Sequence, residues 1–175
     1  MVAKKAAPRV RPTIKLDLSY GPLPPQHPYL RPQGFDPRRY PWTLKADSVS
    51  EAYSRYLLQR IPARDRGRFM DELWRVLVVG GKALIIVPYW ANARAVQDPL
   101  AEWPPFSEQS FLYFNKGFRT DNQLDYNMTC DFDFVYGYTL DPETAAPPDD
   151  TRPFWIKHYG NAVSDLHVTL IKRKA

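Results

Sequence analysis

The chain has 175 residues, of which 44% are hydrophobic and 14% aromatic, and this composition suits one domain with a buried core. It excludes a chain that is disordered throughout. The longest apolar run, residues 83–88, is too short to cross a bilayer, and the first residues lack the apolar stretch of a signal peptide. We therefore expect a soluble, cytoplasmic protein that does not interact with membranes.

The net charge of +5 comes from the two ends of the chain. Residues 1–12 contain four basic residues and no acidic one, and residues 172–175 contain three basic residues. The remaining 17 basic and 19 acidic residues leave the rest of the chain at −2. We predict a basic arm and a basic tail around a single domain at 13–171. Such ends suit contact with nucleic acid or with an acidic protein surface, or they simply aid solubility.

The side chains that most often bind metals are sparse. The only cysteine, Cys130, excludes an intrachain disulfide and a site with several cysteines, and we expect it to be a buried thiol. The three histidines are scattered without the spacing of metal ligands. No metal site is predicted.

In the first third of the chain, a proline-rich segment separates two segments with the pattern of regular secondary structure. Residues 14–18 alternate with period two, which predicts a strand. Residues 22–41 hold seven prolines, which prevent a long helix and predict an extended loop over the surface. Ser48 and Glu51 have the spacing of a capping box, which predicts a short turn of helix, and residues 52–58 fit either its continuation or a strand.

The middle of the chain holds the clearest periodicity. Residues 64–77 place their apolar side chains on one face, which predicts an amphipathic helix, and Gly80 and Gly81 are expected to end it. Residues 82–88 follow as an apolar run, which is typical of a central strand covered on both faces. A helix that leads into a buried strand indicates an α/β layer with a mostly parallel sheet.

The last third predicts four further elements. A short helix is expected at residues 107–115, and residues 131–140 alternate as a strand with an aromatic face. Residues 141–153 are acidic and proline-rich, which predicts a loop, and residues 165–171 have the alternation of a closing strand.

Two adjacent stretches carry a resemblance to a known family. Residues 68–77 (RFMDELWRVL) and 80–88 (GGKALIIVP) resemble the helix, turn and fifth strand of the class I S-adenosylmethionine (SAM)-dependent methyltransferases. Shorter matches within residues 41–171 look like an uncharacterised methyltransferase-like group of phage and bacterial genomes. The resemblance implies a Rossmann-like fold, mostly parallel with an antiparallel C-terminal strand and shortened in its N-terminal half. A phage protein of this kind would lie in the host cytoplasm or the virion.

The resemblance also implies where SAM would bind, if the chain still binds it. Asp17, Ser19 and Gly21 stand where the family has a glycine-rich turn after its first strand. Asp36 is the nearest candidate for the acidic residue that holds the ribose, and Asp98 follows the fifth strand. These five residues form the candidate cofactor site. No catalytic residue is assigned.

The sequence departs from the family pattern at the positions that matter for chemistry. The turn has a single glycine beside the bulky Tyr20, and residues 21–50 are too few for all the helices and strands that the family has there. Two loops that carry histidines and a carboxylate in the related group read Leu-Gln-Arg-Ile at 58–61 and Asp-Pro-Leu-Ala at 98–101. Groups able to take up protons near neutral pH are thereby replaced.

Three functions follow from this sequence. The favoured one is a methyltransferase-fold protein that has lost catalysis, needs no cofactor, and acts as a binding or assembly module. It would contact a protein partner or another copy of itself through residues 1–41, whose large apolar side chains suit wrapping; alternatively, the proline-rich loop covers its own domain. The second function is a small active SAM-dependent methyltransferase. The third is a nucleic-acid-binding protein that uses the basic ends.

Overall fold

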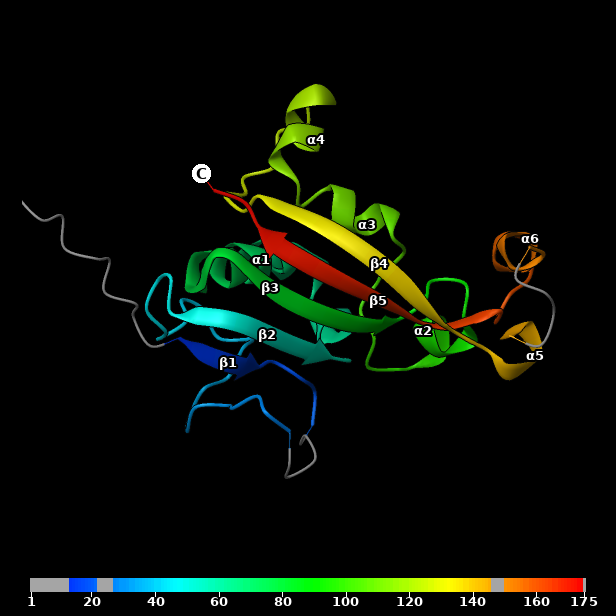
Figure 1. The fold of residues 1–175 in the computed structure, drawn as a ribbon, viewed down its shortest axis with the longest axis horizontal. Helices are drawn as coiled ribbons and strands as arrows, with labels where there is room; N and C mark the ends of the chain where they lie inside the picture. The colour runs from blue at the N-terminus through cyan, green and yellow to red at the C-terminus, as the bar shows by residue number, and fades with distance from the viewer. Residues whose placement is uncertain (1–12, 22–26, 146–149, 175) are drawn as a thin grey trace, which may run out of the picture.

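The computed structural model describes residues 13–21, 27–145 and 150–174. They form one five-stranded sheet in the order β1-β2-β3-β5-β4 (Figure 1). β1, β2 and β3 run parallel, and β5 lies antiparallel between β3 and β4. The strands are β1 (Ile14–Asp17), β2 (Val49–Arg55), β3 (Leu77–Pro88), β4 (Phe132–Leu140) and β5 (Val163–Lys172).

One long helix and several short ones accompany the sheet. The long helix α1 connects β2 to β3 and buries Phe69, Met70 and Leu73 in the core. The helices are η1 (Leu58–Arg60), α1 (Ala63–Val76), α2 (Ala93–Gln97), α3 (Gln109–Leu112), α4 (Lys116–Asp121), α5 (Pro142–Ala145) and α6 (Arg152–His158).

Most predicted elements are confirmed. The first strand, the amphipathic helix, the aromatic strand and the closing strand lie within one or two residues of their expected bounds. β3 is the third of the five strands, so its apolar run is central, and the mixed, mostly parallel sheet is confirmed. Cys130 is buried, as expected. Burial raises the pKa of its thiol to about 12.

The helical turn predicted at Ser48 and Glu51 is wrong, because β2 begins there. The Ser48 N–H donates to the Val76 carbonyl at 2.9 Å. The Ser48 carbonyl accepts from the Ile14 N–H at 3.0 Å. Glu51 reaches across to Lys15 at 3.0 Å instead of capping a helix. The pairing of β2 with β1 and β3 therefore outweighs the local capping signal.

The predicted glycine cap of α1 is also wrong. The helix ends at Val76, and β3 starts at the next residue. Gly80 and Gly81 lie inside β3, at a shift in register against β2. Val49 pairs with Leu77, but Glu51, two residues later, pairs with Lys82, five residues later. The extra residues of β3 bulge out, with Gly80 at φ +75°, and a side chain on Gly81 would lie 2.8 Å from the Val78 carbonyl oxygen.

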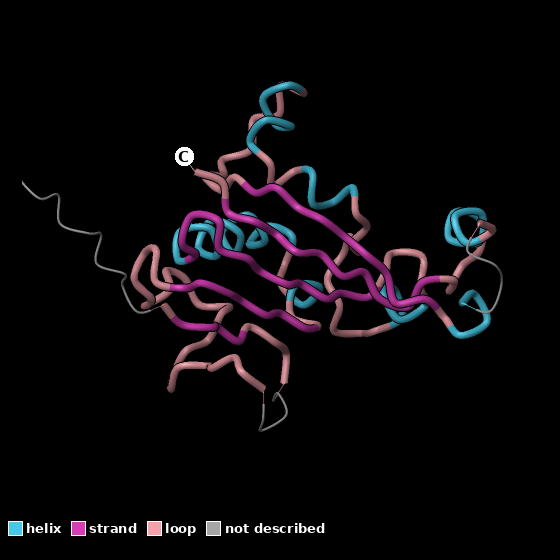
Figure 2. The backbone as a smooth tube through the Cα atoms, viewed as in Figure 1, coloured by secondary structure: helices cyan, strands magenta, loops and turns pink. Residues whose placement is uncertain are grey.

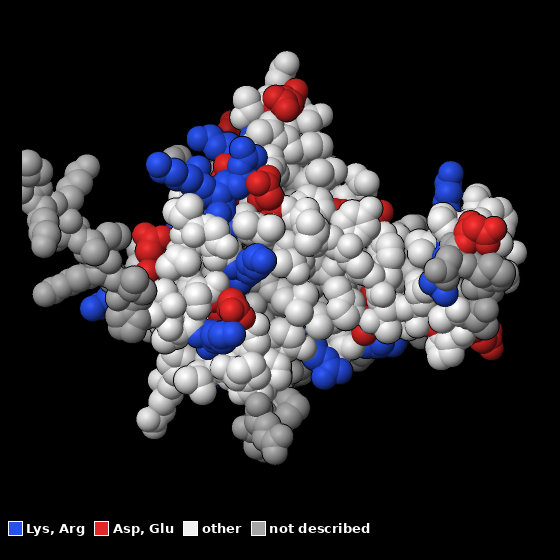
Figure 3. Space-filling model, in the orientation of Figure 1, with Lys and Arg blue, Asp and Glu red and all other residues white. Residues whose placement is uncertain are grey.

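The two faces of the sheet differ in their cover. Alternate residues of β3, such as Ile85, are fully buried, whereas Leu84 and Ile86 on the other face are only partly buried. Figures 1 and 2 show the described helices behind the sheet or beyond its edges, with no helix in front of it. The open face in the centre of Figure 3 is largely uncharged. The prediction that β3 is covered on both faces is therefore wrong.

Two predicted boundaries shift for local reasons. The helix expected at 107–115 is only the single turn α3, after which Asn115 caps the separate helix α4 by accepting from the Phe118 N–H at 2.9 Å. The loop expected at 141–153 contains α5 and the start of α6, and residues 146–149 lie outside the described residues. Pro153 fits α6 because it stands at the first turn, where a missing N–H costs nothing.

The described part of the proline-rich loop packs on its own domain. The Leu30 N–H donates to the Lys15 carbonyl, and the Leu30 carbonyl accepts from the Asp17 N–H, both at 2.9 Å. This bridge covers the outer edge of β1, and Phe35 packs edge-on against the buried Trp42. Residues 13–21 and 27–48 contain no helix, which is the shortened N-terminal half that was expected. The basic arm, residues 1–12, lies outside the described residues.

Candidate functional site

Two adjoining cavities lie where the parallel strands end. Their volumes are about 280 Å³ and about 370 Å³, and Tyr20 lines both. The first opens beside the turn after β1, and the second lies beyond the ends of β2 and β3. The carboxyl ends of parallel strands are the usual ligand sites of such sheets. We call them the first and the second cavity.

The turn after β1 forms one wall of the first cavity. Asp17 and Ser19 are 5% and 3% exposed. One carboxylate oxygen of Asp17 accepts from the Ser19 N–H at 2.8 Å, and the Ser19 hydroxyl accepts from the Arg55 N–H at 3.1 Å. Gly21 has φ +82°, which a glycine adopts without strain. The turn is therefore held rigidly by its own hydrogen bonds.

Arg31 fills the polar centre of this turn. Its Nη2 donates to the second carboxylate oxygen of Asp17 at 2.8 Å and also to the Ser19 carbonyl, and it lies 3.5 Å from the Gly21 carbonyl. The neighbouring residue Leu30 fixes its position by bridging β1. One guanidinium thus neutralises the buried Asp17 carboxylate and occupies the backbone oxygens around it.

Asp36 also lines the first cavity. Its carboxylate accepts from the Arg38 N–H at 3.0 Å and from Arg38 Nε at 3.1 Å. The hydrogen bond from the Arg38 side chain holds the pKa of Asp36 below its usual value. Asp36 is therefore ionised and paired at neutral pH.

The second cavity has a different chemistry. Arg60 Nη2 donates to Asp98 at 2.6 Å, and its guanidinium lies 4.2 Å from the centre of the Tyr20 ring. The Arg60 and Asp98 side chains are 18% and 26% exposed, so this pair is largely shielded from water. Gln59, in the same 3₁₀ turn, is 6% exposed and lines the cavity.

Tyr56 and Arg94 complete the second cavity. Tyr56 has φ +56°, a conformation that is strained for a bulky residue, directly after β2. Its hydroxyl donates to Asp165 at 2.8 Å, and the Arg94 guanidinium lies 5.4 Å from its ring. A hydrogen bond with Tyr56 raises the pKa of Arg94, so this guanidinium remains charged.

Known structures share this fold, although no protein-family model and no curated protein matches the chain. A SAM-dependent methyltransferase from Archaeoglobus fulgidus superposes with a TM-score of 0.50 at 8% identity, over 74% of this chain and 62% of that one. A SAM-dependent methyltransferase from Thermotoga maritima, named as a possible histamine N-methyltransferase, superposes with a TM-score of 0.50 at 14% identity, over 83% of this chain and 65% of that one.

The chain has a Rossmann-like methyltransferase fold. At these identities the similarity concerns the fold alone. The chain spans less than two thirds of the length of either methyltransferase.

The five residues of the candidate cofactor site separate into two groups on this methyltransferase fold. Ser19, Gly21 and Asp36 line the first cavity, and Asp17 lies beneath them with its carboxylate on Arg31. Asp98 belongs instead to the second cavity, paired with Arg60. The sequence contained no signal for Arg31, Tyr56 or Arg94, since each approaches its cavity from a different loop or helix.

A buried arginine holds the loop that carries Asp98. Arg66, on α1, donates to the carbonyls of Ile61, Glu102 and Pro104 at 3.0, 2.8 and 2.7 Å. Burial lowers the pKa of its guanidinium to about 10. The loop after α2 is thus tied to the helix behind the sheet, which fixes one wall of the second cavity.

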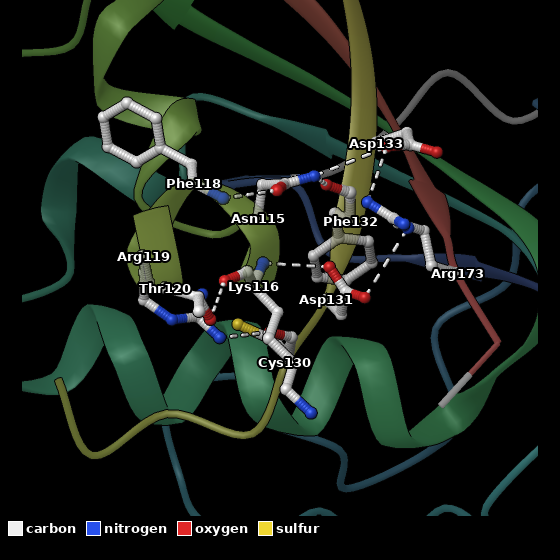
Figure 4. Close-up of polar contacts among 10 residues, drawn as sticks. All are labelled: Asn115, Lys116, Phe118, Arg119, Thr120, Cys130, Asp131, Phe132, Asp133 and Arg173. Carbon is white, nitrogen blue, oxygen red and sulfur yellow. Dashed lines mark hydrogen bonds and ion pairs between the residues drawn. The ribbon is translucent and has the colours of Figure 1, made fainter. Parts of the chain in front are cut away.

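The basic C-terminal end is largely neutralised within the fold. Lys172 belongs to β5, is 6% exposed, and lies 2.8 Å from Asp47. Arg173 lies 3.6 Å from Asp131 and 3.4 Å from Asp133 (Figure 4). In Figure 3 the basic side chains near the C-terminus accordingly have acidic ones among them. The charge expected to attract nucleic acid at this end is therefore mostly paired internally.

The described residues contain neither a cluster of metal ligands nor a helix that could span a membrane. Within residues 13–21, 27–145 and 150–174, no three His, Cys, Asp or Glu side chains are grouped to share a metal ion. In the same part of the chain, no helix has the length and apolar character needed to span a membrane.

Proposed function

We propose that this chain is a methyltransferase-fold binding module that does not use SAM. The observation that carries the proposal is the position of Arg31 in the turn after β1, on Asp17, Ser19 and Gly21. A cofactor that used this turn would have to displace a guanidinium from a buried carboxylate. Removing one partner of a buried ion pair is costly, so the turn favours its present, self-paired state.

The groups around the second cavity support the same proposal. Arg60 carries a permanent charge and cannot serve as a base, and Asp98 is paired with it at 2.6 Å. The raised pKa of the Cys130 thiol and its burial in the core also remove the only cysteine as a nucleophile. A general acid and base pair suited to neutral pH is lacking among the described residues that line either cavity.

The test of this proposal is calorimetry with SAM and with S-adenosylhomocysteine. We expect no saturable binding, or a dissociation constant weaker than about 1 mM. The variant Arg31→Met empties the turn, and a gain of SAM binding in this variant would identify Arg31 as the group that blocks the cofactor. Micromolar SAM binding by the unaltered chain would contradict the proposal.

A second candidate is a small active SAM-dependent methyltransferase. It is favoured by the two adjoining cavities at the ends of parallel strands and by the activity of the solved structures that share the fold. Micromolar SAM binding that Asp36→Ala abolishes would support this function. Asp36 is the better test residue here, because Asp17→Ala would also remove the partner of Arg31.

The partner of the binding module is another protein or a second copy of this chain, contacted through the basic arm at residues 1–12. The arm has four basic residues and no acidic one, so its contribution should depend on salt. The test deletes residues 1–12 and measures self-association by sedimentation at low and high salt. It separates the contribution of the arm to self-association from that of the domain. If assembly is unchanged at every salt concentration, the arm is not a binding element.

A further inference from the structure

Two residues that line the second cavity have buried polar atoms without a hydrogen-bond partner among the described residues. Gln59 is 6% exposed, and its Oε1 has no partner among the residues that the structure describes. Arg60 uses Nη2 on Asp98, but its Nε and Nη1 are buried and unpaired within the same described residues. Buried polar groups are normally paired, so each unpaired one needs an explanation. These three unpaired atoms belong to neighbouring residues that line one cavity.

The unpaired atoms define the chemistry of a ligand. Arg60 offers only N–H donors on a permanent positive charge, so they suit an acidic oxygen. The Gln59 oxygen accepts, so it suits an N–H or O–H group nearby on the same ligand. Arg60 pairs with Asp98 at 2.6 Å and Arg94 lies 3.5 Å from Asp165, so the charges around the cavity are balanced. The attraction for an acidic oxygen therefore rests on the Arg60 Nε and Nη1, which have no partner among the described residues.

The cavity is also shaped and held for a small molecule. Its volume of about 370 Å³ lies within the range of small-molecule sites. The Tyr20 ring covers one side of the Arg60 guanidinium at 4.2 Å and Asp98 holds its Nη2, so its direction is fixed in advance. The Gln59 carbonyl accepts from the Glu102 N–H at 2.7 Å, which ties this wall to the loop that carries Asp98.

We propose that the second cavity binds a small organic anion, whose acidic oxygen pairs with Arg60 and whose N–H or O–H group donates to Gln59. This site goes beyond the binding module proposed above and does not depend on it. The first cavity offers no such site at its turn, because Arg31 already satisfies Asp17 there.

The test is a titration of the full chain, at constant salt, with N-acetylglycine, which has a carboxylate and an amide N–H. Chemical shifts of the backbone amides around Tyr20, Gln59 and Asp98 report binding. We expect saturable changes with a dissociation constant in the millimolar range, as suits so small a ligand. The neutral N-acetylglycinamide should bind at least about fivefold more weakly, and butanoate, which lacks the N–H, should be weaker than N-acetylglycine.

Three variants separate the contributions. Arg60→Met should weaken N-acetylglycine binding at least about tenfold. Gln59→Leu should bind N-acetylglycine and butanoate equally, and this variant keeps the test open if Arg60→Met does not fold. Arg64→Met removes a charge from a side chain that is 86% exposed and does not line the second cavity, so it should bind as the unaltered chain does. Equal binding by Arg60→Met, or no saturable change up to several tens of millimolar, would overturn the proposal.

Discussion

The two cavities at the ends of the parallel strands lie side by side but differ in how their polar groups are paired. In the first, Asp17 is fully engaged by Arg31 and by the Ser19 N–H. In the second, Gln59 and Arg60 have buried polar atoms that lack a hydrogen-bond partner among the residues that the structure describes. Under the two proposals above, the chain closes the first site with its own side chain, and the second site accepts a ligand. The comparison then teaches that the pairing of the polar groups, and not position in the fold alone, decides which of the two sites binds.

The largest effect is expected when the closed site is broken. Arg31→Met leaves the Asp17 carboxylate, 7% exposed, without its counter-charge. We expect a loss of about 3 kcal/mol in the free energy of unfolding, because a buried charge is left uncompensated. Urea unfolding followed by circular dichroism measures it.

The matched control is Arg39→Met, since Arg39 is 89% exposed and lies 3.7 Å from Asp36. It should cost less than about 0.5 kcal/mol. Equal losses in the two variants would mean that the Arg31 pair does not hold the turn.

A smaller loss is expected at the anchor of the open site. Arg66→Met removes three hydrogen bonds to the carbonyls of Ile61, Glu102 and Pro104, at a cost of about 2 kcal/mol. The loop with Asp98 should loosen, so amide exchange there should accelerate more than in the strands. Uniform acceleration over the whole domain would show that Arg66 supports the core and not this wall.

The open site should respond in the opposite direction to substitution. Gln59→Leu puts an apolar side chain of similar size in place of a buried amide, whose oxygen has no hydrogen-bond partner in the described part of the chain. We expect the unfolding free energy to stay the same or to rise by up to about 1 kcal/mol, because the substitution removes no hydrogen bond to the Gln59 side-chain oxygen. A loss of more than about 1 kcal/mol would show that the Gln59 oxygen is paired in the unliganded protein.

The smallest effect concerns Asp36 and depends on pH. Its pKa is lowered in the folded state, mainly by the Arg38 side chain, so its contribution is present above the unfolded value of 3.8 and is lost as pH falls through the folded pKa. Asp36→Asn should cost less than about 1 kcal/mol at pH 7, and the difference from the unaltered chain should disappear once the pH falls below the folded-state pKa of Asp36. A difference that persists in acid would point to packing instead of charge.

The sequence predicted the regular elements well and the site only in part. Three elements were predicted from local patterns: the strands at 14–18 and 131–140 from period-two alternation, and the helix at 64–77 from its helical period. All three are present in the structure. The prediction failed at Ser48 and Gly80. A helix cap was expected at both places, but both lie where β2 pairs with β3. Strand pairing supplies several hydrogen bonds at once, which outweighs a single local cap.

The sequence by itself determined the α/β class, the central strand, the buried Cys130 and the shortened segment between β1 and β2. Only the tertiary structure decided that Arg31 occupies the turn at Asp17, that Gln59, Arg60 and Asp98 share a cavity with Tyr20, and that none of the described helices covers one face of the sheet. These contacts join residues that are far apart in the chain, such as Arg31 and Asp17 at 14 positions and Arg60 and Asp98 at 38. Periodicity reports which side of an element is apolar, but which loops meet at a sheet end depends on strand order and on the path of the chain between strands.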